Sequence, residues 1–180
     1  VLQDAYEKPL MADLELDVSG AADAVAELVS FKPIEALRTV DFKADDFSGK
    51  VRGKAKIRLG LVPDQQPPAP NWTAEIDLED VDVGKPFDGR KISDVNGKLI
   101  VDAAKAKLDA EARIDDVPMD VELVEPVRRG AGEVARERVV TATLDNATRD
   151  KLVPGLGELV SGPMKIELRR LDETRQAVSV

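Results

Sequence analysis

The most constraining feature of this sequence is an alternation of apolar and polar residues that returns in segment after segment. In one of these segments, an apolar set and a polar set alternate strictly: Trp72, Ala74, Ile76 and Leu78 against Thr73, Glu75, Asp77 and Glu79. A period of two residues is typical of a β-strand with one apolar and one polar face. Further segments with this pattern begin near Ala12, Val51, Val95, Ala106, Val117, Val140 and Met164. The sequence therefore predicts an all-β fold of roughly eight strands.

Short connections between these segments indicate that neighbouring strands are antiparallel. Asp102-Ala103-Ala104 and Asp115-Asp116 are typical of hairpin turns. A parallel crossover needs about a dozen residues or more, which these connections do not provide. Two longer breaks, at about residues 63–71 and 125–136, are rich in Pro or Gly and are predicted to be exposed loops.

Helical content is predicted to be small. One helix is expected over Ala21–Ser30, with Pro33 ending it and a further turn completing a helical insert at about residues 20–38. A second short helix is expected over Ala147–Val153, with Pro154 as its end. The expected N-caps are Ser19 or Gly20 for the first helix and Asp145 or Asn146 for the second.

Two short helices cannot cover one face of so many strands, so the apolar face needs another cover. Aromatic residues make up only 3% of the chain, and the stretch with Ala106, Ala110 and Ala112 is thin for a tightly filled interior. We therefore expect a mainly antiparallel, curved, taco-like sheet with an apolar groove. The alternative is an ordinary β-sandwich or barrel in which small residues interlock with larger ones.

The candidate groove residues are those that share the apolar parity of their segments. They are Ile57, Leu59, Ile76, Leu78, Leu99, Val101, Leu108, Ala110, Ala112, Ile114, Met119, Val121, Leu123, Val140, Ala142, Leu144, Met164, Ile166 and Leu168. Each of them is also an ordinary core residue if the fold closes around it.

The polar faces of two neighbouring segments carry opposite charges. They present Arg52, Lys54, Lys56 and Arg58 in the one and Glu75, Asp77 and Glu79 in the other. If these strands pair, the charges form cross-strand contacts worth about 0.2–1 kcal/mol each. We interpret them as a solvated sheet surface and not as a binding site.

Composition excludes several classes of function. Cys and His are both absent, which removes the usual nucleophile pairs and the thiolate or imidazole metal sites. A net charge of −9 argues against a nucleic-acid partner, and no apolar run approaches the roughly 18 residues of a membrane helix. We expect no enzymatic activity, no cofactor and no metal ion.

Two charged clusters are candidate sites. The acidic residues around Asp80 and Asp82 lack the spacing of a Ca²⁺ loop and are interpreted as solvated charge. The basic residues Arg128, Arg129, Arg136 and Arg138 surround a glycine-containing loop and are interpreted as a solvated hairpin. Contact with anionic lipid head groups is the alternative for this basic patch.

Three stretches share a Ser-Gly or Asn-Gly turn that leads into an alternating strand, at residues 47–55, 95–101 and 160–166. The block Val18–Leu28, followed by Pro33-Ile34, resembles the small-residue helix before a Pro-apolar step in AsmA-like proteins. The similarity runs from about Leu10 to Leu171. We therefore expect residues 1–180 to be a single β-rich segment excised from a longer chain.

The resemblance to AsmA-like proteins implies a periplasmic location, in a parent chain anchored in the inner membrane of Gram-negative bacteria. It implies a non-enzymatic role in outer membrane biogenesis, in which acyl chains of phospholipid or another lipid move along the apolar sheet between the two membranes. Partners would be lipids and envelope proteins, with membrane contact only through other parts of the parent. The alternative function is a structural or protein-interaction β-sandwich module of the cell envelope.

Overall fold

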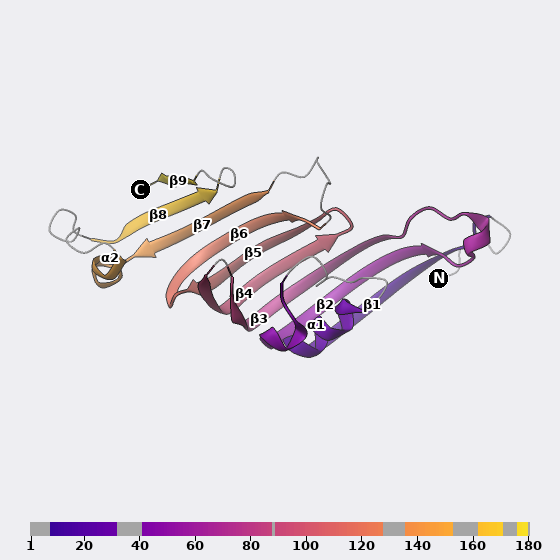
Figure 1. Cartoon of the computed structure of the whole chain (residues 1–180), viewed down its shortest axis with the longest axis horizontal. Helices are drawn as coiled ribbons and strands as arrows, with labels where there is room; N and C mark the ends of the chain where they lie inside the picture. Colours follow the sequence, from indigo (N-terminus) through magenta and orange to yellow (C-terminus); the bar gives the residue numbers. More distant parts are fainter. Residues whose placement is uncertain are drawn as a thin grey trace.

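The chain forms one open antiparallel sheet in which every strand pairs with its neighbours in sequence (Figure 1). The structure is a computed structural model and describes residues 8–31, 41–87, 89–127, 136–152, 162–170 and 176–179. The strands are β1 (Met11–Ala21), β2 (Phe47–Gly60), β3 (Asn71–Phe87), β4 (Arg90–Asp102), β5 (Lys105–Ile114), β6 (Val117–Pro126), β7 (Glu137–Leu144), β8 (Met164–Arg170) and β9 (Gln176–Ser179). The prediction of an all-β, antiparallel, curved sheet is confirmed.

Helices contribute little to the described residues. They are α1 (Ala22–Ser30), α2 (Asn146–Leu152) and the single 3₁₀ turns η1 (Ala44–Asp46) and η2 (Pro63–Gln65). Asp145 caps α2 as predicted, since its Oδ1 accepts a hydrogen bond from the Thr148 N–H at 2.7 Å. The predicted turn after Pro33 and the predicted end of the second helix at Val153 lie outside the described residues.

The predicted cap of the first helix is wrong. Ser19 and Gly20 belong to β1, whose pairing with β2 continues through Ala21 opposite Lys50. Their backbones pair with β2 as part of the sheet. Ala21 is therefore the N-cap, and its side chain provides no hydrogen bond to the helix. The helix therefore starts directly from the last residue of the strand.

The two predicted hairpin turns are confirmed. Asp115 and Asp116 both have positive φ values, 50° and 66°, as in the tight type I′ turns that match the twist of β-hairpins. The Asp102 carboxylate accepts hydrogen bonds from the backbone N–H groups of Ala104 and Lys105, at 2.7 and 2.9 Å. Side-chain oxygens of this kind favour turns over continued strand.

On the outer face, the register places opposite charges across β2 and β3 as predicted, with Arg52 opposite Asp77 and Lys54 opposite Glu75, but the ion pairs among the described residues use other partners. Lys50 of β2 lies 3.9 Å from Glu79 of β3. Ion pairs also join β2 to β1, where Lys54, Lys56 and Arg58 lie 3.8–4.0 Å from acidic partners: Asp17, Glu15 and Asp13. These pairs are largely exposed, so each stabilises the sheet by about 1 kcal/mol or less.

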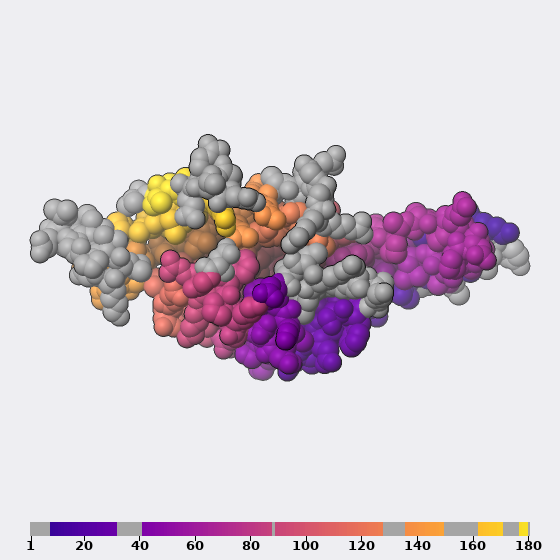
Figure 2. Space-filling model, in the orientation of Figure 1, coloured from indigo at the N-terminus to yellow at the C-terminus, as the bar shows by residue number. Residues whose placement is uncertain are grey.

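Irregular pairing bends the β3–β4 hairpin out of the plane of the sheet. The register shifts between Leu78 and Val81. Asp80 lies between them, and its φ of 49° interrupts the extended backbone. Its N–H donates to Asn96 Oδ1 at 3.0 Å, and Asn96 Nδ2 donates back to Asp80 Oδ1 at 3.2 Å. Bulges of this kind bend strands, and the hairpin end stands in front of the sheet (Figures 1 and 2).

The core is built from small residues. Buried Ala22 of α1 packs with a cluster from β2 to β6 made of Val51, Val81, Val95, Ala110, Ala112 and Val121. A second small cluster contains Val117, Ala142 and Leu144. The described strands form one sheet and not the two stacked sheets of a sandwich. Within the described residues, no helix is long and apolar enough to cross a membrane.

Candidate functional site: an apolar face with a charged corner

All of the predicted groove residues lie on one face of the sheet, which we call the apolar face. The register joins its positions into rows that cross the strands. One row, the apolar row, contains residues from all nine strands: Gly20, Val51, Leu78, Gly97, Ala110, Val121, Val140, Leu168 and Val178. Every member is apolar or glycine, so one continuous row without charged or polar side chains crosses the described sheet.

The middle of the apolar face is covered by the protein itself. Val25 of α1 and Phe47 at the start of β2 pack against the central cluster. Ala110, Ala112 and Val121 belong to the same cluster, with Val81 and Val95 of the β3–β4 hairpin, and are buried, at 6–7% exposure. These predicted groove residues belong to the core, as do Ala142 and Leu144 near α2.

The two ends of the apolar face are uncovered. At the β1 end, Leu14 and Leu16 are 43% and 45% exposed. At the other end, Leu168 and Val178 are 40% and 61% exposed and pair directly across β8 and β9. Leucine and valine side chains this exposed in the middle of paired strands form a surface suited to apolar ligands.

The end of the β3–β4 hairpin is held over the apolar face by aromatic contacts. The Phe87 ring stacks on Phe42, with centroids 6.0 Å apart, and Phe42 also contacts Phe47 at 5.6 Å. Lys85 forms an ion pair with Asp41. This hydrogen-bonded ammonium lowers the pKa of the Asp41 carboxyl below its usual value.

A charged cluster interrupts the apolar face at one corner. Glu125, Arg138 and Arg170 occupy positions of apolar parity at the ends of β6, β7 and β8, where Leu123 pairs with Arg138 and Arg138 pairs with Arg170. Arg138 Nε donates to Glu125 Oε1 at 2.5 Å, and Arg136 Nε lies 3.3 Å from Glu125 Oε2. We call these four residues the charged corner.

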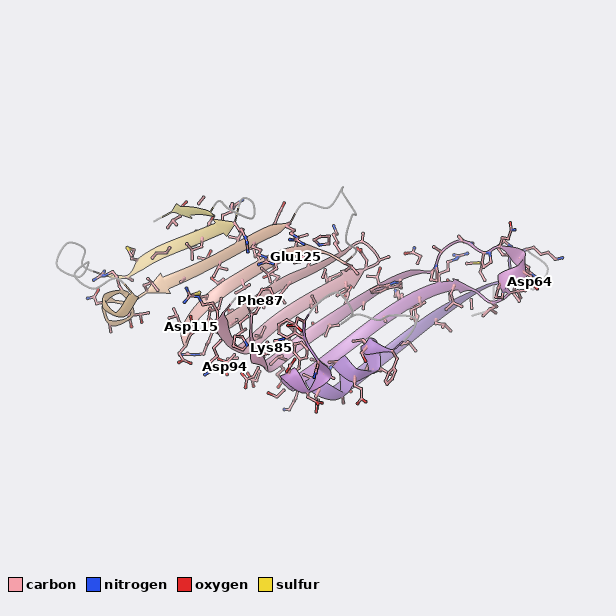
Figure 3. The ribbon with its side chains drawn as sticks, in the orientation of Figure 1. Asp64, Lys85, Phe87, Asp94, Asp115 and Glu125 are labelled. Atoms are coloured by element: carbon pink, nitrogen blue, oxygen red, sulfur yellow. The ribbon has the colours of Figure 1, made fainter. Side chains whose placement is uncertain are left out.

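The charged corner lies beneath the hairpin end. The Arg138 guanidinium carbon is 5.3 Å from the centroid of the Phe87 ring, which is within the range of a cation–π contact. In Figure 3, Glu125 lies above Phe87, whereas Asp94 and Asp115 lie at the lower rim of the sheet. Between the hairpin end and β8, the surface of β6 and β7 is recessed (Figure 2).

The interpretation of Arg138 as part of a solvated hairpin is wrong. Arg138 lies within β7, its side chain is 20% exposed, and it belongs to the apolar face. The predicted loop at residues 125–136 also begins too early, because Glu125 and Pro126 are the last residues of β6. The missed signal was parity: Glu125 continues the series Val121–Leu123, and Arg138 precedes Val140 in the same alternation.

A shallow pocket near the β1 end is lined mainly by outer-face residues, together with Leu14, Ile57 and Trp72 of apolar parity. It has a volume of about 260 Å³ and lies among alternating charges on β1 and β2. Its lining includes Asp13, Glu15, Lys56, Arg58 and Thr73, which have outer-face parity. Among the described residues, no group of three or more acidic side chains is placed to hold a metal ion.

No family model, no curated protein and no solved structure that was compared with this chain matches it.

Proposed function

We propose that this chain carries lipid acyl chains on its apolar face, as one segment of a longer periplasmic protein that moves phospholipid between the inner and outer membranes. The observation that carries the proposal is the apolar row, which crosses nine strands, together with the exposed apolar side chains at the two ends of the same face: Leu14 and Leu16 on β1, and Leu168 and Val178 on β8 and β9. The Ser-Gly and Asn-Gly strand motifs and their resemblance to AsmA-like proteins support the periplasmic placement. The proposed role involves no catalysis.

The energetics favour sliding over tight capture. Removing an acyl chain from water is worth about 0.8 kcal/mol per buried CH₂ group. Because apolar positions along the row bury similar areas of the acyl chain, the binding free energy of that acyl chain changes little as it moves from one position to the next. The open strand edges leave the polar head group in water while the acyl chain is buried.

The covered middle sets a condition for this proposal. A continuous path past Ala110 and Val121 requires the β3–β4 hairpin end to move, or requires the lipid to pass beside it. The uncovered ends need no such movement. Lipid contact is therefore expected first at Leu14, Leu16, Leu168 and Val178.

The test is photocrosslinking of the detergent-free protein to phospholipid vesicles, with a photoreactive residue introduced at Leu16 or Leu168. The matched control position is Ile100, which is also apolar and 36% exposed but has outer-face parity in β4. We expect lipid adducts at Leu16 and Leu168 and none above background at Ile100. Equal labelling at all three positions would contradict the proposal.

A binding variant sharpens this test. The double substitution Leu14→Asn and Leu16→Asn removes about 1 kcal/mol of apolar contact per leucine, which corresponds to roughly a fivefold loss of lipid occupancy for each. Ile100→Asn is the control and is expected to leave occupancy unchanged. Adducts to another protein instead of lipid would favour the alternative, an interaction module whose apolar face binds a protein partner.

A further inference from the structure

The charged corner is unusual because it occupies positions that are apolar elsewhere on the same strands. Among the described residues of β5 to β8, the apolar face carries charged side chains at three positions, and all three meet in this corner: Glu125, Arg138 and Arg170. A charge on a partly dehydrated apolar surface costs free energy, and aliphatic replacements of such pairs are often more stable. Packing alone therefore does not account for this cluster.

Among the described residues, the corner contains three arginines and one carboxylate, although the whole chain has a net charge of −9. Arg136 and Arg138 both contact the single carboxylate of Glu125, and Arg170 lies beside Arg138 in the register. Arginine keeps its charge at every physiological pH, and its planar guanidinium matches phosphate and carboxylate oxygens. The corner is thus suited to an anionic group.

An exposed apolar surface adjoins the corner. Leu168 precedes Arg170 by two residues on the same face of β8, and Val178 pairs with Leu168 from β9. Both are among the most exposed large apolar residues of the described chain. Cationic and apolar surfaces therefore meet within one strand pair.

We propose that the charged corner binds the anionic head group of an amphiphile whose acyl chain lies on Leu168 and Val178. This inference rests on the proposed function, since it assigns a head-group site to the same lipid-carrying face. Arg138 and Arg170 contact the head group, while Glu125 holds Arg138 in place and competes with the ligand for it. The chemical class is a lipid with a phosphate-bearing, negatively charged head.

The test measures which lipid the detergent-free protein takes from vesicles. The vesicles are phosphatidylcholine with equal amounts of phosphatidylglycerol and diacylglycerol that carry the same acyl chains, and bound lipids are quantified by mass spectrometry. We expect the protein to enrich phosphatidylglycerol over diacylglycerol. Arg170→Gln is expected to lower this enrichment about fivefold. The substitution removes a charge-assisted hydrogen bond to the head group, and partial hydration of this site limits the size of the effect.

Arg169→Gln is the matched control, because Arg169 is the next residue, has outer-face parity and pairs with Glu167 at 3.3 Å. It removes the same charge and is expected to leave the enrichment unchanged. Glu125→Gln is the second variant, and it is expected to raise the enrichment because it removes the competing carboxylate. An unfolded Arg170→Gln protein would thus still leave Glu125→Gln to decide the question.

The outcomes separate the two proposals. Lipid uptake with an enrichment that neither Arg170→Gln nor Glu125→Gln changes would overturn the head-group site and leave the acyl-chain proposal standing. Uptake of no lipid at all would overturn both. Inorganic phosphate alone is titrated as a separate arm, and phosphate binding as tight as that of phosphatidylglycerol would assign the corner to a free anion and overturn the inference.

Discussion

The middle and the β1 end of the apolar face have the same sequence pattern but different surroundings. In the middle, Ala110 and Val121 are buried in the central cluster, which also contains Val81 and Val95 of the β3–β4 hairpin. At the β1 end, Leu14 and Leu16 have the same parity and remain more than 40% exposed. Alternation therefore determines which face a residue occupies, whereas separate elements determine whether that residue is core or a surface open to ligands.

The first prediction separates the two regions by stability. Leu108→Asp, in the covered middle, is expected to lower the free energy of unfolding by about 3 kcal/mol or more, because a carboxylate would replace a side chain packed on the central cluster. Leu16→Asp, at the open end, is expected to cost less than about 1 kcal/mol, because that position is already hydrated. Urea denaturation measures both.

Lys107→Ala is the control for the first prediction, since Lys107 neighbours Leu108 but lies exposed on the outer face. It should change stability by less than about 0.5 kcal/mol. If Leu16→Asp were as destabilising as Leu108→Asp, the β1 end would be packed like the middle. The contrast between the two regions would then be wrong.

The second prediction compares two glycines of the apolar face. A Cβ atom at Gly97 would lie 2.3 Å from the Asp109 carbonyl oxygen and 2.4 Å from the Ala110 Cα. Gly97→Ala is therefore expected to cost about 1–3 kcal/mol, because β5 must move away. At Gly53, the nearest atoms to such a Cβ lie 3.6 Å away or further.

Gly53→Ala is the matched control and is expected to be neutral or to stabilise the sheet by about 0.5 kcal/mol, since alanine loses less backbone entropy in a strand. Thermal unfolding of both variants measures the difference. Equal melting temperatures for the two variants would show that strand spacing at Gly97 is no tighter than at Gly53.

The sequence predicted the two faces of the sheet well, because parity and short turns are local signals. Ile76, Leu99 and Leu108 were placed on one face by alternation alone, and the register joins them in one row. The cover over the middle was not predictable in this way. It depends on the bend at Asp80 and Asn96, where hydrogen bonds link residues on different strands.

The charged corner is a second feature that local sequence patterns do not predict. Its parity is visible in the sequence, but the short distance from Arg138 to the glycine-containing loop favours assigning it to that loop, although it alternates with Val140. Only the pairing of β6 with β7 brings Arg138 to Glu125, and only the bent hairpin brings Phe87 over Arg138. Long-range contacts, and not local propensity, make these residues a candidate site.

The smallest predicted effect concerns the rim of the covered middle, where the β5–β6 turn is tied to the start of β4. Arg90 Nη1 donates to Asp115 Oδ2 at 2.7 Å, and the Lys91 N–H donates to Asp115 Oδ1 at 3.0 Å. These hydrogen bonds lower the pKa of the Asp115 carboxyl below its ordinary value of 3.8, and the hydrogen bond from Arg90 has the larger effect. The carboxylate therefore contributes stability above that ordinary value, and the contribution is lost as the pH falls through the lower pKa of the folded state.

Asp115→Asn keeps an oxygen acceptor for the Lys91 N–H and tolerates the positive φ of this position, but it removes the charge. We expect its stability to be slightly lower than that of the unsubstituted protein at neutral pH, and the difference to vanish in acid once Asp115 is protonated in both states. Thermal unfolding followed between neutral pH and pH 2 measures this convergence. A constant difference across that range would mean that the substitution acts through the shape of the turn, and that ionisation of Asp115 does not fasten this rim of the covered middle.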